Sequence, residues 1–242
     1  MTKIIEITKN ERPFLVHEYT RPFWQKLQKG LWERETFEVL DKFLNPNHLY
    51  VDVGSWIGPT VLYGAQTAKR SYALEPDPVA FAQLRANVNL NPKLASKIEL
   101  HNYAIAEKNG QIRLGNRNQL GDSMTGVLFA NAPNSFLTDA VTLEEFFERN
   151  DIKDCNLIKI DIEGGEVSVI PQSKDFFRRT KIPLYLSLHP LWFEDKEKNI
   201  EAVIDGLSSY GKYYDKNFTP MRLREIGDIL KREKLFEIIA TS

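Results

Sequence analysis

Apolar runs alternate with helical patterns along the first half of the chain. Residues 49–53, 71–74 and 98–102 are short runs of aliphatic, β-branched and aromatic side chains, which is typical of strands. Between them, residues 60–68 and 79–90 place apolar side chains at helical spacing. Strands that alternate with helices at this interval predict βαβ units and a parallel sheet.

The second half of the chain continues this alternation. Residues 157–162 and 183–188 are apolar at most positions, as expected of parallel strands that are buried on both faces. Thr142 is a suitable N-cap for a helix over residues 143–149. Beyond residue 198 the pattern predicts, in order, a helix, a strand at Tyr213 and Tyr214, a helix over residues 221–232 and a strand over residues 236–240.

Two segments lie outside the alternation. Residues 21–44 predict an aromatic-rich helical segment that covers the site or the sheet edge, and residues 111–114 and 125–130 predict short strands of an inserted hairpin. We therefore expect an α/β, doubly wound, Rossmann-like fold with a seven-stranded, mostly parallel sheet and helices on both faces. Residues 1–47 are expected to form an N-terminal helical cap, and residues 48–242 the main domain.

Charge and composition narrow the class of protein. The 32 Lys and Arg residues nearly balance 33 Asp and Glu, so no nucleic-acid partner is expected. No stretch approaches the about 20 apolar residues that span a bilayer, and residues 1–12 lack the apolar core of a secretory signal. We therefore expect no membrane insertion and a cytoplasmic protein. Cys155 is the only cysteine, which excludes an intrachain disulfide; the sequence does not indicate an oligomeric state.

A glycine loop follows the first strand of the predicted sheet. Gly54 and Gly58 flank Ser55 in this loop, and Asp52 precedes them. The spacing differs from the Gly-x-Gly-x-x-Gly pattern that cradles a pyrophosphate, and no Gly-Lys-Ser/Thr follows, so a dinucleotide or P-loop site is disfavoured. An acid at this position suits a ligand with positive charge, while the alternative is a tight strand–helix turn that binds no ligand.

A second acid ends the next strand. Glu75 stands where a doubly wound fold places a carboxylate that accepts hydrogen bonds from ribose hydroxyls. Pro76 and Asp77 continue the turn, which Pro76 and Pro78 make rigid. Taken alone, Glu75 could be a solvated loop residue. Its combination with Asp52 and the glycines in this order favours a nucleoside-binding site.

The sequence resembles the FkbM family of S-adenosylmethionine-dependent methyltransferases. The resemblance runs from about Phe23 to His189 and is strongest at residues 157–166, LIKIDIEGGE; it also includes the segments at residues 23–33, 50–54 and 74–78. It implies a class I methyltransferase fold. It also implies O-methylation of a hydroxyl, often in a sugar, a glycan or a secondary metabolite.

The resemblance also implies roles for individual residues. Asp52, Gly54 and Gly58 are expected to line the S-adenosylmethionine pocket, and Glu75 to hold the ribose. Ser55, with Trp56, stands where the family usually has small residues followed by Asn, so the contact to the methionine end is expected to differ. The remaining expected cofactor contacts are Pro76, Asp77, Ala104 and Asp161.

Acidic residues and one histidine gather at the ends of the later strands. Asp161 and Glu163 are two positions apart, so on an ideal strand their side chains point the same way, and Lys159 shares that parity. Asp161 is expected to face the methyl-transfer centre. His189 follows the next strand and has a suitable pKa range for a general base. Asp161 and His189 could together hold a divalent ion such as Mg²⁺, and metal dependence is left open.

Several other functions compete with an O-methyltransferase. An N-methyltransferase or nucleic-acid methyltransferase uses the same fold, but the latter commonly carries an Asn/Asp-Pro-Pro-aromatic motif where this chain has residues 161–164. An NAD-dependent dehydrogenase is disfavoured by the glycine spacing. A non-catalytic S-adenosylmethionine-binding module would not need Asp52, Glu75 and Asp161 together at the strand ends. We therefore expect an enzyme that acts on a small-molecule or glycan hydroxyl.

Overall fold

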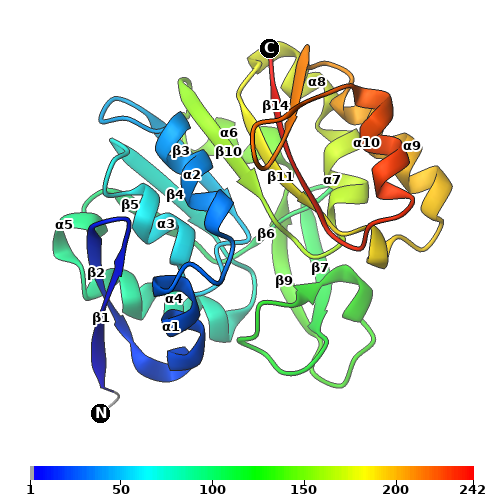
Figure 1. Cartoon of the computed structure of the whole chain (residues 1–242). Helices are drawn as coiled ribbons and strands as arrows, with labels where there is room; N and C mark the ends of the chain where they lie inside the picture. Colours follow the sequence, from blue (N-terminus) through cyan, green and yellow to red (C-terminus); the bar gives the residue numbers. More distant parts are fainter. Residues whose placement is uncertain (1–2) are drawn as a thin grey trace.

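An eight-stranded mixed sheet forms the centre of the computed structural model, which describes residues 3–242 (Figure 1). In spatial order its strands are β13 (Pro220–Met221), β12 (Lys212–Asp215), β14 (Phe236–Thr241), β11 (Leu184–Leu188), β10 (Cys155–Ile160), β3 (Leu49–Val53), β4 (Arg70–Leu74) and β5 (Ile98–His101). The five strands from β11 to β5 are parallel, and β14, β12 and β13 pair antiparallel. The predicted count of seven was wrong, because residues 220–221 pair with β12 as an additional short edge strand.

Helices cover both faces of this sheet, as the alternation of side chains along β3 requires. Val51 and Val53 pack in one apolar cluster with helices of the second half, whereas Tyr50 packs in another with helices of the first half. The helices of the first half are α2 (Arg34–Phe43), α3 (Pro59–Gly64), α4 (Pro78–Asn89) and the short α5 (Pro92–Ala95). Those of the second half are α6 (Leu143–Arg149), α7 (Glu166–Gln172), α8 (Lys174–Thr180), α9 (Lys196–Leu207) and α10 (Leu223–Leu230), with the 3-10 turn η3 (Pro190–Trp192).

The N-terminal segment begins with a β-hairpin rather than a helix. Strands β1 (Ile4–Lys9) and β2 (Arg12–His17) precede the turn η1 (Glu18–Thr20) and helix α1 (Arg21–Gln28). The helical segment predicted over residues 21–44 consists of two helices, α1 and α2, because Gly30 and Glu33 between them adopt left-handed conformations, with φ of 69° and 35°. Residues 1–2 of the predicted cap lie outside the described part of the chain.

A second, smaller sheet is inserted between β5 and α6, and its strands are green in Figure 1. Its order is β6 (Ala104–Ile105), β9 (Phe136–Val141), β7 (Gly110–Asn116) and β8 (Thr125–Gly126). The prediction of a strand near residues 111–114 is confirmed. The strand predicted over residues 125–130 is limited to β8 and continues as a 3-10 turn, η2 (Val127–Phe129), and β9 was not predicted.

The chain reverses direction across the sheet between β3 and β10. From β3 it proceeds to β4 and β5 on one side, and it returns through β10 and β11 on the other. Ligands bind in the crevice outside the carboxyl ends of the strands at such a switch point. The loops after β3, β4 and β10 are therefore the expected location of the site. No helix in the described part of the chain is long and apolar enough to cross a membrane.

Candidate active site

Two adjoining cavities lie at the switch point. The larger has a volume of about 710 Å³ and the smaller about 460 Å³. The wall that they share consists of Gly54, Trp56, Ser123, Asp161 and Glu163. Cavities with mixed apolar and polar walls at such a position are typical of small-molecule sites.

Gly54 allows the backbone to turn tightly at this shared wall. Its φ is +82°, and a Cβ atom there would lie 1.8 Å from the carbonyl oxygen of Asp161. The N–H groups of Gly54 and Ser55 both donate to the carbonyl of Leu74, at 3.0 Å, which ties the loop to β4. Ser55 lines the smaller cavity. Gly58 lines neither cavity; it has φ +98° at the start of α3, and a Cβ there would meet Leu84, so it serves packing.

Asp52 lies behind the cavities and does not line them. Its side chain is fully buried, and one carboxylate oxygen accepts a hydrogen bond from Thr60 Oγ1 at 2.6 Å. The other oxygen lies 3.5 Å from Lys159 Nζ. Burial raises the pKa of Asp52 above its usual value. Asp52 thus contacts Thr60 and Lys159, which line the smaller cavity, and its direct contact with the cofactor stays a prediction.

Glu75 lines the larger cavity, as predicted for a ribose-binding acid. Its two carboxylate oxygens accept hydrogen bonds from the backbone N–H groups of Trp56 and Asp77, each at 2.8 Å. Burial raises its pKa to about 8. Pro76 and Ala104 also line this cavity.

Asp77 has a structural position instead of the predicted ligand contact. It is fully buried and caps α4, accepting from the backbone N–H of Val79 at 2.8 Å. Its second oxygen accepts from Gly121 N at 2.8 Å and from Thr125 Oγ1 at 2.9 Å. Asp77 thereby holds the loop over residues 121–125. Asp122 and Ser123 of this loop line the larger cavity.

Lys159 is a buried cation surrounded by carboxylates. Its Nζ atom lies 3.5 Å from Asp52 Oδ1 and 3.5 Å from Asp161 Oδ2. Burial acts to lower the pKa of Lys159, but Asp161, Asp52 and Glu33 outweigh it and hold that pKa above the usual value. Glu33 shares the smaller cavity with Lys159, and burial, with Asp161 adding to it, raises its pKa to about 8. Glu33 was not predicted as a site residue, although it ends one of the segments that carry the family resemblance.

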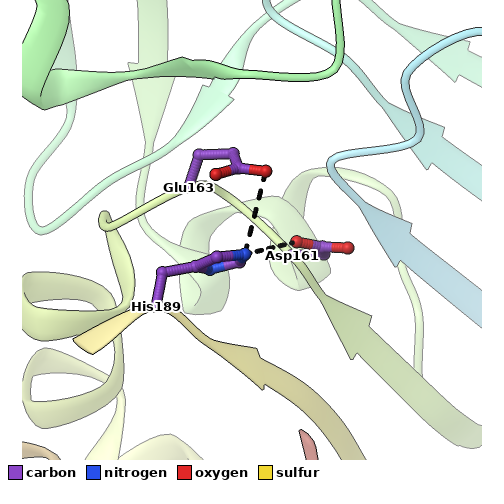
Figure 2. A group of neighbouring side chains, drawn as sticks. All are labelled: Asp161, Glu163 and His189. Atoms are coloured by element: carbon purple, nitrogen blue, oxygen red, sulfur yellow. Dashed lines mark ion pairs between the residues drawn. The ribbon is translucent and has the colours of Figure 1, made fainter. Parts of the chain in front are cut away.

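The predicted group of Asp161, Glu163 and His189 comes together at one place (Figure 2). Strand β10 ends at Ile160, two residues before the predicted end, so strand parity does not align the two acids. Instead Glu163 adopts a left-handed conformation with φ of 50°, and its carboxylate faces His189. His189 Nε2 lies 3.6 Å from Asp161 Oδ1 and 3.7 Å from Glu163 Oε1. Burial raises the pKa of Glu163 to about 7.

His189 is held from its other side by Glu166. Its Nδ1 lies 3.0 Å from Glu166 Oε1, and Glu166 is fully buried. Burial acts to lower the pKa of His189, but Glu166, Asp161 and Glu163 outweigh it and raise that pKa to about 10. These carboxylates favour a proton on His189, whereas a general base needs the neutral imidazole, so its role as general base stays a prediction. Glu166 was not predicted as a site residue, although it lies within the LIKIDIEGGE block.

The strand order and this site define a Rossmann-like methyltransferase fold. The methyltransferase FkbM from Methylobacillus flagellatus KT has a similar crystal structure, with 16% sequence identity and a TM-score of 0.51 over 90% of this chain and 54% of that chain. A model of the methyltransferase FkbM domain matches residues 52–214, which is more than half of the chain. The chain therefore belongs to the FkbM methyltransferase domain family. The predictions of this family and of a methyltransferase domain are confirmed.

Two other methyltransferases are similar to the chain at low sequence identity or over a short stretch. The ribosomal protein L11 methyltransferase of Carboxydothermus hydrogenoformans is 29% identical over 109 residues, or 36% of this chain and 35% of that protein. An rRNA methylase from Streptococcus thermophilus has a TM-score of 0.48 and 9% identity over 86% of this chain and 93% of that chain. The chain thus spans about a third of the L11 methyltransferase and about half of the FkbM crystal structure.

Proposed function

We propose that the chain is an O-methyltransferase that transfers the methyl group of S-adenosylmethionine to a hydroxyl of a sugar, a glycan or a secondary metabolite. The observation that carries this proposal is the pair of adjoining cavities that share Asp161 and Glu163 in their common wall. One cavity suits the nucleoside, and the carboxylates stand where a hydroxyl would meet the methyl group.

The larger cavity suits the adenosine part of the cofactor. Glu75 keeps lone pairs for the two ribose hydroxyls, because its two backbone hydrogen bonds use only part of the acceptor capacity of a carboxylate. Ala104 and Leu114 provide an apolar wall for the adenine. We place the amino-acid end in the smaller cavity, where Lys159 and the carboxyl group of Glu33 offer polar partners to a zwitterion.

The N-terminal segment contributes to this second cavity through Trp32 and Glu33. This supports the proposal that residues 1–47 act as a cap on the amino-acid end of the site. We further propose that the acceptor is not a nucleic acid, since the charges of the protein nearly cancel.

An aromatic surface lies beside the proposed acceptor position. The indole N–H of Trp192 lies 3.3 Å from Glu163 Oε2, and the ring centroids of Trp192 and Phe129 are 5.5 Å apart. Arg117 lies over Trp192, 5.7 Å from its ring centroid. Aromatic faces next to carboxylates are suited to a polyhydroxylated ring, whose C–H face packs on the indole while its hydroxyls bind the acids. This supports a sugar as the acceptor.

The chemistry requires an aligned hydroxyl and the removal of its proton. Methyl transfer proceeds by in-line attack, so positioning of the hydroxyl supplies much of the acceleration. Asp161 faces both cavities and is the proposed catalytic carboxylate, with Glu163 beside it as a second acceptor of the proton. His189, being held between these acids, would orient them.

The test begins with calorimetric titration of the purified chain with S-adenosylhomocysteine, with NAD as the control. We expect micromolar binding of the first alone. Turnover is then followed with isotopically labelled S-adenosylmethionine and separate panels of sugars, RNA and peptides. Asp161→Asn should keep S-adenosylhomocysteine binding and lose turnover. Binding of NAD alone, label on RNA alone, or full turnover by Asp161→Asn would each contradict the corresponding part of the proposal.

A further inference from the structure

We propose that Asp161, Glu163 and His189 form a binding site for a divalent transition-metal ion such as Mn²⁺, with Glu166 as the supporting residue. Each of the three offers one ligand atom, and these atoms lie within 4.8 Å of one another. Figure 2 shows the three side chains pointing toward a common point from the ends of β10 and β11. All three proposed ligands belong to this chain. Metal binding by them does not depend on the identity of the methyl acceptor.

The distances in this group fit a shared cation better than direct hydrogen bonds. His189 Nε2 is 3.6 Å from Asp161 and 3.7 Å from Glu163, which is beyond the usual 2.7–3.2 Å of an N–H···O hydrogen bond. Two ligand atoms that are each about 2.0–2.2 Å from one ion lie about 3–3.6 Å apart. Small side-chain movements would therefore bring all three atoms into coordination distance.

The orientation of the histidine is a second, independent observation. His189 is buried, and its Nε2 makes no hydrogen bond among residues 3–242 but lies within ion-pair distance of Asp161 and Glu163. Its Nδ1 is held at 3.0 Å by Glu166, which itself accepts backbone hydrogen bonds from Ile162 at 3.1 Å and Gly164 at 2.9 Å. Metal-binding histidines almost always donate their other ring N–H to such a carboxylate, which fixes the ring and aims the free nitrogen at the ion.

The backbone at Glu163 is consistent with a functional requirement. A φ of 50° is uncommon for a residue other than Gly, Asn or Asp, and such conformations concentrate at active and ligand-binding sites. Here that conformation is what turns the Glu163 carboxylate toward His189 and Asp161. The following residue, Gly164, also has a positive φ, of 98°, so the whole turn departs from extended geometry.

The ligand set also indicates which kind of ion would bind. One imidazole nitrogen and two carboxylates suit a first-row transition metal, whereas Mg²⁺ prefers oxygen ligands and retains several waters. Asp161 and Glu163 line both cavities and His189 lines neither, so the open coordination positions would face the cavities. An ion there could bind the acceptor hydroxyl and lower its pKa; this consequence, unlike the binding itself, rests on the proposed function.

The test uses the full chain, stripped with a chelator, and Mn²⁺ alone as the probe. Loss of the electron paramagnetic resonance signal of free Mn²⁺ measures binding, without cofactor or acceptor present. We expect saturable binding of one ion per chain. His189→Gln and Glu163→Gln should each weaken it at least tenfold, and Glu166→Gln should weaken it about 10–100-fold, as for other supporting residues. Excess Mg²⁺ should compete only weakly.

A matched control is available in the same chain. His101 is a half-buried histidine whose Nε2 lies 3.4 Å from Glu99, but it is not part of the three-residue group. His101→Gln should leave Mn²⁺ binding unchanged. Far-ultraviolet circular dichroism and S-adenosylhomocysteine titration of every variant would show whether it remains folded.

Two results would overturn the metal site: no Mn²⁺ binding by folded wild-type protein, or binding that His189→Gln leaves unchanged. These outcomes are distinguishable from a failure of the proposed function. If S-adenosylhomocysteine binds and Mn²⁺ does not, the metal inference is wrong and the methyltransferase proposal stands. If Mn²⁺ binds and is lost in His189→Gln, the metal site is supported even where no acceptor is methylated.

Discussion

Replacement of Glu75 by glutamine is the most direct test of where the nucleoside binds. The substitution preserves size and one carbonyl oxygen, but it replaces the other oxygen by an NH₂ group and removes the charge. In the structure both carboxylate oxygens accept backbone N–H groups, from Trp56 and Asp77 at 2.8 Å each. The new NH₂ group would therefore face one of these N–H donors, and it could not accept a hydrogen bond from a ribose hydroxyl.

The magnitude follows from the lost hydrogen bonds. A hydrogen bond to a charged group contributes about 1.5–3 kcal/mol, and Glu75→Gln removes at least one such bond to the ribose. A loss of about 1.4 kcal/mol corresponds to a tenfold rise in the dissociation constant. Above pH 8, where Glu75 is ionised, we therefore expect Glu75→Gln to weaken S-adenosylhomocysteine binding tenfold or more. Glu75→Ala should weaken it at least as much, because it leaves both backbone N–H groups without their carboxylate partner.

Calorimetric titration with S-adenosylhomocysteine measures the effect, and thermal unfolding shows whether the loop after β4 is preserved. Glu99→Gln serves as the control, because Glu99 lies on the adjacent strand β5, pairs with Arg70 and does not line either cavity. Its affinity should equal that of the wild type. An unchanged dissociation constant in Glu75→Gln, with the wild-type melting temperature, would refute the assignment of Glu75 to the ribose.

Three further predictions concern the same region. Gly54→Ala should lower both stability and cofactor affinity, since its Cβ would lie 1.8 Å from the carbonyl oxygen of Asp161; wild-type values in denaturant unfolding and titration would contradict this. Lys159→Met should destabilise the fold by about 3–5 kcal/mol, because Asp52 and Asp161 then lose their shared cation; an unchanged denaturation midpoint would show that this reasoning is wrong. The pKa of Glu75 is raised from 4.5 to about 8, so without cofactor its neutral form stabilises the fold below about pH 4.5, and that contribution is lost as the pH rises through 8. Ribose binding needs the carboxylate, so affinity for S-adenosylhomocysteine should rise from pH 6 to pH 8, and titrations of Glu75→Gln should lack this slope.

The elements of the central sheet could be predicted because their hydrophobic patterns are strong. Strand β3 was predicted with its observed bounds, Leu49–Val53, since it is buried along nearly its whole length. Strand β9 was missed because Phe136–Val141 places Thr138 and Ala140, rather than large apolar residues, at inward positions. Its two neighbours, β6 and β7, supply the pairing that the local sequence does not indicate.

Site residues could be predicted where one strand end fixes the position. Gly54, Glu75 and Asp161 each follow a parallel strand, and each lies at a cavity wall. Asp77 was predicted as a cofactor contact, but in the structure it caps α4. The sequence contained a signal for this cap, because Asp is a common N-cap and Pro, here Pro78, is common at the first position of a helix. Glu33 reaches the site from a segment far away in sequence, and only tertiary packing brings it near Lys159.

Carboxylates outnumber cations at the shared wall. Their negative charge explains how Lys159 can be buried there as a cation. Lys159 compensates Asp52 on the side away from the cavities and Asp161 at the wall, while His189 lies between Asp161 and Glu163. If either cation were replaced by an apolar residue, buried carboxylates would remain without a partner, which costs several kcal/mol. The remaining negative charge faces the place proposed for the sulfonium of S-adenosylmethionine. The same arrangement that stabilises the fold thus favours a positively charged group at the point where the two cavities meet.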